Sequence, residues 1–461
     1  MGWKEHLKQL GYDPENPMQA KIDEWWGWYT ATNDWYVYIE TDVSARRTYR
    51  VERLSLRPGK MVAQEWASML LNERTLVSVA DDDTANTWLE EWLDASKFLL
   101  TGQGLLERTF ALGSGAWALR VEGMAPAPAT TPGARIVAQR FDARSVVPLS
   151  YDEDGCTECA FVSKVVHKGK TYDQLQLHLL DESGVYRVET VLFDKRGNLT
   201  ELPGIGGTLT SPGDTPLFAL MRPGLENVHV DYCPLGVSVF DDAIGAIKIV
   251  DTAVTGLYKD LWLGEKMLFL DERMLTQDAE GKVVVPREKD QQLFRKTEGD
   301  GTNNLIEEYN PDLRVDANRL ALMTGLELLG QRCGMGADYF SYGDGGEGLK
   351  TATEVVSDKS DLFRSTRKHE NVIEPAIRTI IRGVLYLAGV VIGESMPADP
   401  EIAVVFDDSV IEDTAAERKQ DLEDVAAGLM QPWEYRVKWY GEDEKTAKSM
   451  APGFELPPEE L

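Results

Sequence analysis

The sequence predicts an α+β protein of several domains, in which strands and helices occupy separate parts of the chain. Its 461 residues are too many for one compact core. Strand-like runs follow one another from residue 135 to 225 with no helical pattern between them, which argues against a parallel α/β domain. From residue 236 onward, apolar residues recur instead at the 3.6-residue period of helices.

Composition indicates a globular protein without an export signal or a membrane span. Hydrophobic residues make up 43% of the chain, which excludes wholesale disorder. The N-terminal residues lack an apolar signal core. The longest apolar run, from Ile380 to Gly393, contains Arg382 and is shorter than the ~20 residues that span a bilayer. The four cysteines are scattered, as expected in a reducing cytoplasm.

The chain is strongly acidic, with a net charge of −29. A protein that holds DNA by its phosphates needs a basic surface, whereas an acidic surface repels a polyanion. Tight or sequence-reading DNA binding is therefore not expected. Solubility is one explanation of the charge.

Residues 1–60 are dense in tryptophan, which we interpret as a packing cluster or a subunit contact in preference to a ligand site. The tryptophans are Trp3, Trp25, Trp26, Trp28 and Trp35. Apolar spacing in the first 122 residues predicts four helices and then a strand. The helices span Ile22–Tyr29, Met61–Leu71, Thr84–Leu100 and Leu105–Leu112, and the strand spans Ala116–Glu122.

An antiparallel sheet module is expected at about residues 135–225, after a Pro/Ala/Thr surface loop at 123–134. Turn compositions such as DEDG, DESG and DKRGN separate its strand-like runs. These runs are Ile136–Phe141, Cys159–His167, Tyr172–Leu180, Val185–Phe193 and Leu217–Arg222.

Two long helices with a small insert between them are expected next. A stripe from Phe240 to Leu261 predicts the first helix, with Ser238 as its N-cap. The second begins at the strong start signal Asn310–Asp312 and ends at Arg332, with Gly334 in the left-handed stop position. The ~45-residue insert has the length of a small subdomain. Its predicted strands are Lys266–Leu270 and Lys282–Val285.

A glycine-rich loop followed by one long helix is the most distinctive stretch of the chain. Thr351 and Glu354 form a capping box at the start of this helix, and isoleucines and valines then recur along one buried face. From Thr351 to about Leu387 the helix would measure ~55 Å, at 1.5 Å per residue. Pro375 lies inside it, lacks an N–H and clashes with the carbonyl of Asn371, so a kink is expected between these two residues.

The last part of the chain, residues 394–461, is predicted to hold one strand, Ile402–Phe406, and one helix from Asp407 to Met430. Gly428 or the pair Gln431–Pro432 is expected to end that helix. No internal repeat is visible at a period of 20–50 residues.

The order of these elements resembles that of tailed-bacteriophage portal proteins (head-to-tail connectors), of the siphophage type. The resemblance is strongest from Pro234 to Gly393, where the Gly- and aromatic-rich loop and a TATEV-type helix start precede the long helix. It implies a portal fold with an α/β wing, two stem helices, a small α/β clip, a long kinked helix and a helical crown. The implied domains are a wing at 1–235, a stem helix at 236–264, a clip at 265–308, a stem helix at 309–333, a tunnel loop at 334–350, a long kinked helix at 351–393 and a C-terminal wing or crown segment at 394–461.

The resemblance implies a structural function. A homo-oligomeric ring of about twelve subunits would form a channel at one capsid vertex, through which DNA is packaged and later ejected. The implied partners are the terminase large subunit, head–tail adaptor or neck proteins, the major capsid protein, scaffold, and double-stranded DNA that passes without sequence-specific binding. Such a protein is not an enzyme, uses no cofactor, binds no membrane, and enters the virion after assembly in the host cytoplasm. The acidity would then suit a channel wall past which DNA slides.

Five residues of the loop are candidate DNA-tunnel residues: Tyr339, Phe340, Tyr342, Asp344 and Lys350. Aromatic rings and a lysine projecting into a channel would touch DNA weakly and without reading its sequence. Glycine would let each loop move separately. The alternative is that the aromatic side chains pack against the neighbouring subunit.

Two other functions compete with the portal interpretation. One is a nucleotide-binding enzyme that uses this loop, because Gly343–Gly348 matches GxGxxG. The match fails on context, since Leu349 stands where a phosphate-binding loop needs its lysine, and Asp344 and Glu347 would repel phosphate. The other is a different minor head protein, which the sequence does not separate from a portal.

No catalytic or metal site is predicted. Cys156 and Cys159 form a lone CxxC without a second pair at matching spacing, and we interpret them as inert thiols. Joining Cys233 and His229 to them would require the fold to bring them together. The five histidines show no HExxH spacing, no GxSxG occurs, and paired acids are expected by chance among 77 acidic residues.

Overall fold

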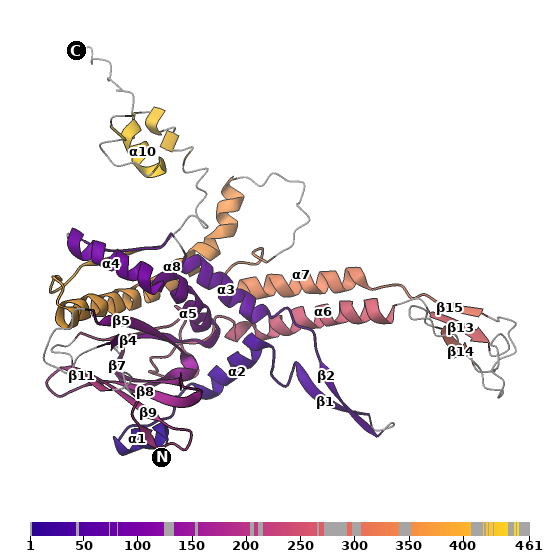
Figure 1. Ribbon diagram of the computed structural model, residues 1–461. Coiled ribbons are helices and arrows are strands. Elements are labelled where there is room, and N and C mark those ends of the chain that lie inside the picture. Colours follow the sequence, from indigo (N-terminus) through magenta and orange to yellow (C-terminus); the bar gives the residue numbers. More distant parts are fainter. Residues whose placement is uncertain are drawn as a thin grey trace, which may run out of the picture.

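The computed structural model consists of a mixed α and β body from which two long helices and one hairpin project (Figure 1). It describes residues 2–42, 46–72, 74–80, 82–123, 133–152, 155–202, 207–210, 215–264, 267–271, 293–296, 306–340, 352–406, 418, 421–422, 424–426, 428–440, 447–448 and 450. The helix pair carries a small sheet at its far end, and the short C-terminal helix α10 (Pro432–Tyr440) lies on another side of the body.

The N-terminal part is mostly helical, and the structure corrects its predicted boundaries. The predicted single helix Thr84–Leu100 is wrong, because α4 ends and α5 begins on either side of Lys97. Lys97 adopts a left-handed backbone with φ 51°, which turns the chain so that Phe98 stacks on Trp117 in the core. The elements are α1 (Trp3–Gln9), α2 (Gln19–Thr30), β1 (Val37–Asp42), β2 (Arg47–Glu52), α3 (Pro58–Leu70), β3 (Leu76–Val79), α4 (Asp83–Ser96) and α5 (Phe98–Leu112).

Two antiparallel sheets replace the single predicted sheet module. One has the order β10-β9-β8-β7-β6, with β11 also on β9, and the other has the order β12-β4-β5. The predicted runs Ile136–Phe141 and Leu217–Arg222 therefore do not join the larger sheet. These two runs form β5 and β12, which pair with β4 on its two edges. The first five residues of β4 are buried. The strands are β4 (Gly115–Glu122), β5 (Arg135–Asp142), β6 (Val146–Asp152), β7 (Gly155–His167), β8 (Lys170–Leu180), β9 (Tyr186–Phe193), β10 (Leu199–Thr200), β11 (Gly207–Thr210) and β12 (Phe218–Met221).

The main hydrophobic core lies between the β4 sheet and the helices α3, α5 and α8. Trp66, Phe110 and Trp117 are fully buried there, and each such side chain contributes on the order of 2 kcal/mol through burial. A smaller core holds Leu7 of α1 against the larger sheet. The N-terminal tryptophans Trp25 and Trp28 also belong to the main core, as the packing-cluster interpretation predicted.

The two projecting helices are α6 (Ile244–Leu263), which follows a short turn η2 (Asp241–Ala243), and α7 (Val315–Arg332). The predicted N-cap Ser238 instead accepts a hydrogen bond from Phe240 N before that turn. The predicted start of the second helix at Asn310 is also wrong. At their far end, β13 (Met267–Asp271) pairs in parallel with β14 (Leu293–Lys296) and antiparallel with β15 (Ile306–Tyr309). The predicted strand Lys282–Val285 lies outside the described residues.

The long helix is confirmed as α8 (Ala352–Leu387), which continues as one π-helical turn, η4 (Ala388–Ile392). Its predicted cap residue Thr351 lies outside the described residues. Residues 361–392 are long and apolar enough to cross a membrane by length and composition alone. The apolar face, including Ile377, Ile380 and Val384, is buried in the main core, as in the central helix of a globular domain.

A strand from the C-terminal part of the chain pairs with a strand from the N-terminal part. The predicted strand is present as β16 (Ile402–Val405), which pairs antiparallel with β3 in the N-terminal part. Of the two predicted ends of the preceding helix, Gly428 fits the structure, because residues 424–426 are helical and Gly428 has φ +74°, whereas Pro432 is the first residue of α10. Proline suits that position, where its missing N–H would have no partner in the helix, and Gln431 N donates to Glu434 instead. Most of the predicted helix Asp407–Met430 lies outside the described residues.

Candidate functional site: the projecting helices and the elements that hold them

The helices α6 and α7 form a closely packed arm (Figure 1). Gly325 permits the approach near the body, since a Cβ there would lie 3.0 Å from Val250 Cγ2. Farther out, Asp260 of α6 accepts hydrogen bonds from Arg314, at 2.5 Å, and from Asn318, at 2.7 Å. The Arg314 contact lowers the pKa of the Asp260 carboxyl, so this link stays ionic at neutral pH. The Arg314 side chain thus binds α6, and α7 begins at the next residue, Val315.

Large apolar side chains on this arm face solvent in the single chain. Trp262 is 60% exposed and Leu320 is 66% exposed, and Tyr258, Leu261 and Val315 are also exposed. A stable monomer rarely leaves that much apolar surface on two adjacent helices uncovered. The arm therefore has the surface of an element that contacts another protein chain.

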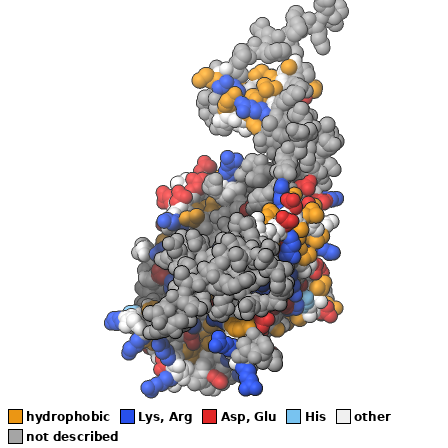
Figure 2. Space-filling view, turned by 90° about the vertical axis from the view of Figure 1, so that its right-hand side faces the viewer, with side chains coloured by type: hydrophobic (Ala, Val, Ile, Leu, Met, Phe, Trp, Pro, Cys, Tyr) orange, Lys and Arg blue, Asp and Glu red, His pale blue; other side chains and the backbone are white. Residues whose placement is uncertain are grey.

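The arm is not the source of the chain's acidity. α6 contains two lysines and two aspartates, and α7 contains two arginines, one aspartate and one glutamate, so the charges cancel in each. Residues 401–461 hold 16 acidic and 6 basic residues, a net charge of −10 out of the total −29. Figure 2, which faces the side to which the arm projects, shows acidic and basic side chains interspersed.

The first two candidate tunnel residues pack against the body of their own chain. Tyr339 donates a hydrogen bond from Oη to Glu65 Oε2 of α3, at 3.0 Å, and burial raises the pKa of its phenol. Phe340 meets the Tyr339 ring edge to face at 4.9 Å, and both rings pack on the main core. The other three candidates, Tyr342, Asp344 and Lys350, lie outside the described residues. DNA contact by any of the five remains a prediction.

The turn that leads from α7 into this segment is fixed by the body. Gly334 has φ +79°, which confirms the predicted left-handed stop. Trp66 Nε1 donates to the Cys333 carbonyl at 3.1 Å, and Met335 N donates to the Gly330 carbonyl at 2.9 Å. The start of the predicted tunnel loop is therefore anchored to α3, close to where Tyr339 docks.

A buried histidine that sequence analysis missed joins α8 to the body. His369 Nδ1 accepts a hydrogen bond from Gly224 N at 2.9 Å, and the imidazole meets the rings of Trp66 and Phe110 edge to face. Burial, with a smaller contribution from Lys368, lowers its pKa to about 3, so the ring is neutral at physiological pH. A Cβ on Gly224 would overlap the Lys368 carbonyl oxygen, so only glycine allows this approach.

Pro375 lies inside α8 as predicted, and the helix changes direction along its length (Figure 1). Its ring leaves the carbonyl of Asn371 without the usual helical donor. That this proline causes the bend remains a prediction, because the packing around His369 acts on the same stretch of the helix.

A buried carboxylate, also missed by sequence analysis, ties α6 to the β1–β2 hairpin. Asp251 accepts hydrogen bonds from Tyr36 Oη at 2.6 Å, Ser55 Oγ at 2.7 Å and Leu56 N at 2.9 Å. Tyr36 immediately precedes β1, and Ser55 and Leu56 follow β2. Burial raises the pKa of Asp251, against the effect of the three donors. The sequence marks Asp251 only as an aspartate within the apolar stripe of a predicted helix.

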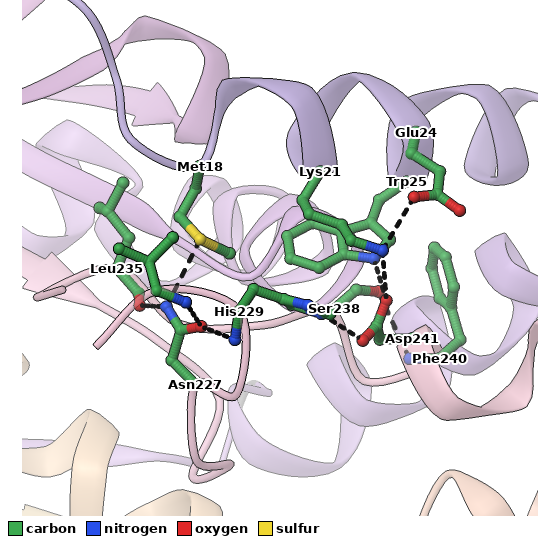
Figure 3. A network of polar contacts seen from close by, with 11 residues as sticks. Met18, Lys21, Glu24, Trp25, Asn227, His229, Leu235, Ser238, Phe240 and Asp241 are labelled. Atoms are coloured by element: carbon green, nitrogen blue, oxygen red, sulfur yellow. Dashed lines mark hydrogen bonds and ion pairs between the residues drawn. The ribbon is translucent and has the colours of Figure 1, made fainter. Parts of the chain in front are cut away.

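A second polar cluster joins α2 to the turn before α6 (Figure 3). Asp241 accepts from Trp25 Nε1 at 2.7 Å, and its other oxygen lies 2.7 Å from His229 Nε2. Lys21 lies 4.0 Å from the same carboxylate. Asn227 orients the His229 backbone through Oδ1 and donates to the Leu235 carbonyl. Together, Asp241 and Asp251 fix the base of α6 at two points.

The cysteines and histidines show no metal-binding geometry. All four cysteines are free thiols, and burial raises the pKa of Cys159 next to Cys156. Within the described part of the chain, no three His, Cys, Asp or Glu side chains converge as metal ligands. His229 pairs with Asp241 and does not join the CxxC pair.

Comparison with known protein families gives a match over most of the chain. The model of the phage portal protein family, SPP1 Gp6-like, matches residues 19–440. No curated protein matches the sequence. Among solved structures, the chain resembles a component of the neck of an empty GTA particle, computed with C6 symmetry. The two share 10% sequence identity with a TM-score of 0.42, over 83% of this chain and 88% of the other.

Proposed function

This chain belongs to the SPP1 Gp6-like family of phage portal proteins, and from that premise we propose that it forms the ring-shaped DNA channel at one vertex of a phage head. The family match is the observation that carries this proposal, because it spans the body, the arm and α8. The family is structural, which supports a place in the virion and no catalytic role. The terminase motor, and not this chain, supplies the energy for packaging.

The exposed apolar surface of the arm supports ring assembly. In a ring of about twelve copies, the arms lie side by side around the axis and cover Trp262, Tyr258 and Leu320. Such arms form the stem of the channel, and β13, β14 and β15 form the clip at its end. The clip docks the terminase large subunit during packaging and adaptor or neck proteins afterwards. The body forms the wing, which contacts the major capsid protein and scaffold.

Mass in solution tests the assembly directly. Light scattering of the purified 461-residue chain should give a mass near twelve chains, and a monomer or dimer would contradict the proposal. Trp262→Ala should shift the mass toward monomer, because the variant removes the largest exposed apolar side chain of the arm. Leu100→Ala is the control, since Leu100 is 69% exposed on α5.

We assign the DNA contact to the loop beyond Phe340. Tyr339 and Phe340 already pack on α3 and the core of their own chain, which leaves Tyr342, Asp344 and Lys350. Because the Asp344 carboxylate would repel phosphate, we assign the attractive contacts to Tyr342 and Lys350. The combined variant Tyr342→Ala, Lys350→Ala should assemble normally and reduce DNA retention in filled heads. Tyr339→Phe is the control, because it keeps the ring and loses only the hydroxyl contacts with Glu65 and Met69 of the same chain. Wild-type retention by the double variant would discard this assignment.

A further inference from the structure

The β1–β2 hairpin stands away from the body with both of its faces exposed (Figure 1). Ile39 is 74% exposed, and Tyr49 on the opposite strand is also exposed. A two-stranded hairpin alone is marginally stable in water, and this one is supported at its base. There Asp251 holds both ends of the hairpin, and the Arg53 guanidinium lies 4.4 Å from the centre of the Trp35 ring. The hairpin is thus anchored to the body at its base, and the described residues of its outer part are exposed to solvent.

The outer part of the hairpin is basic. Residues 43–50 contain three arginines and no acidic residue; Glu40 and Asp42 precede them, so residues 40–50 carry a net charge of +1 in a chain whose net charge is −29. Arg46, Arg47 and Arg50 are all exposed. Arg50 lies 3.0 Å from Glu52, and Arg47 is paired with Asp42 in the strand register, whereas Arg46 lies at the turn. An acidic surface is the complementary partner for such a tip.

A groove of about 990 Å³ on the body offers a surface of that kind. It lies between β12, the loop 226–234 and the part of α8 around Pro375. Three carboxylates, Asp152, Glu226 and Asp231, line it together with a single guanidinium, Arg222. None of its lining residues comes from the hairpin.

An aromatic side chain also lines this groove. Tyr232 lines the groove, is 79% exposed and has φ +56°, a left-handed backbone that is costly for a tyrosine. A ring face beside carboxylates binds arginine by stacking and paired hydrogen bonds. The same chain shows this arrangement elsewhere: the Arg144 guanidinium lies 3.6 Å from the Trp26 ring centre and donates to Asp142 at 2.7 Å.

We propose that the hairpin tip of one copy docks into this groove on the neighbouring copy, with Arg46 and Arg47 against Glu226, Asp231 and Tyr232. The inference rests on the proposed ring. Because the hairpin and the groove are different surfaces of one chain, their contact is heterologous, which is the kind that repeats around a ring. Every copy supplies one hairpin and one groove, so a closed ring leaves neither unfilled.

Charge reversal tests the pairing in the full-length chain. Arg46→Glu with Arg47→Glu, and separately Glu226→Arg with Asp231→Arg, should each raise at least tenfold the protein concentration needed for half-assembly, measured by mass photometry. Combining all four changes restores opposite charges and should recover most of the wild-type assembly. All four positions are exposed, and circular dichroism checks that each variant is folded. The control is Lys168→Glu with Lys170→Glu, which reverses two exposed lysines at the β7–β8 turn and should assemble as wild type.

The outcomes separate this inference from the ring itself. If wild type forms rings and the reversed variants assemble equally well, the hairpin contact is wrong and the ring stands. If each reversal weakens assembly but the four changes together do not restore it, both surfaces contribute to the ring without contacting each other, and the proposed pairing is wrong. If wild type forms no ring, the proposed function fails first.

Discussion

Lowering the pH should loosen the packing of α8 on the body through His369. Burial lowers the pKa of this imidazole to about 3, against ~6.5 in an unfolded chain. Between these values the unfolded chain binds a proton that the folded chain excludes. The stabilising effect of the neutral ring is therefore complete above pH 6.5 and is lost as the pH falls toward 3.

The expected size follows from the same values. At pH 5, about 1.5 pH units below the unfolded pKa, His369 should account for a loss of about 2 kcal/mol of unfolding free energy. His369→Gln removes the titrating group, and its amide oxygen is able to accept the hydrogen bond from Gly224 N. His178, also buried with a pKa lowered to about 3, remains in this variant and leaves a residual pH dependence of similar size.

Urea unfolding followed by tryptophan fluorescence measures this effect, because Trp66 contacts His369 directly. The difference in unfolding free energy between pH 7.5 and pH 5 should be about 2 kcal/mol smaller in His369→Gln than in wild type. His167→Gln, at a partly exposed position in β7, is the matched control. Equal pH dependence in His369→Gln and wild type would refute the reasoning.

Three further substitutions test how the arm and α8 are held. Asp251→Ala leaves three donors unsatisfied and should lower the free energy of unfolding in urea by about 3–5 kcal/mol. The control Asp361→Ala, at an exposed position, should lower it by less than about 1 kcal/mol. Equal losses in the two variants would contradict the buried link. Gly224→Ala forces α8 away from the body and should lower the unfolding temperature by several degrees; an unchanged temperature would show that the contact yields freely. Pro375→Ala supplies the missing N–H and should straighten α8 in a structure of the variant, and an unchanged bend would mean that packing sets it.

Periodicity predicted the elements that bury one face. The strands β7, β8 and β9 and the helix α8 show clear apolar repeats, and the structure confirms them within a few residues. The break at Lys97 was missed because neither glycine nor proline marks it, and tertiary packing of Phe98 imposes it. α7 also starts later than predicted, at Val315, and its N-cap residue Arg314 contacts Asp260 of α6.

The β1–β2 hairpin could not be predicted from a buried face, because both of its faces are exposed. The elements that hold the arm were also hidden in the sequence. Asp251 and His369 are isolated polar residues in helical patterns, and their partners lie 195 to 215 and 145 residues away in the chain. Only folding brings such pairs together.

Electron microscopy of the purified full-length chain tests the central claim most directly. End-on class averages should show a closed ring with a central opening, and side views should show the arms grouped around the axis below a wider body. Particles without an opening, or single chains at concentrations where portals assemble, would contradict the claim that this protein forms a DNA channel.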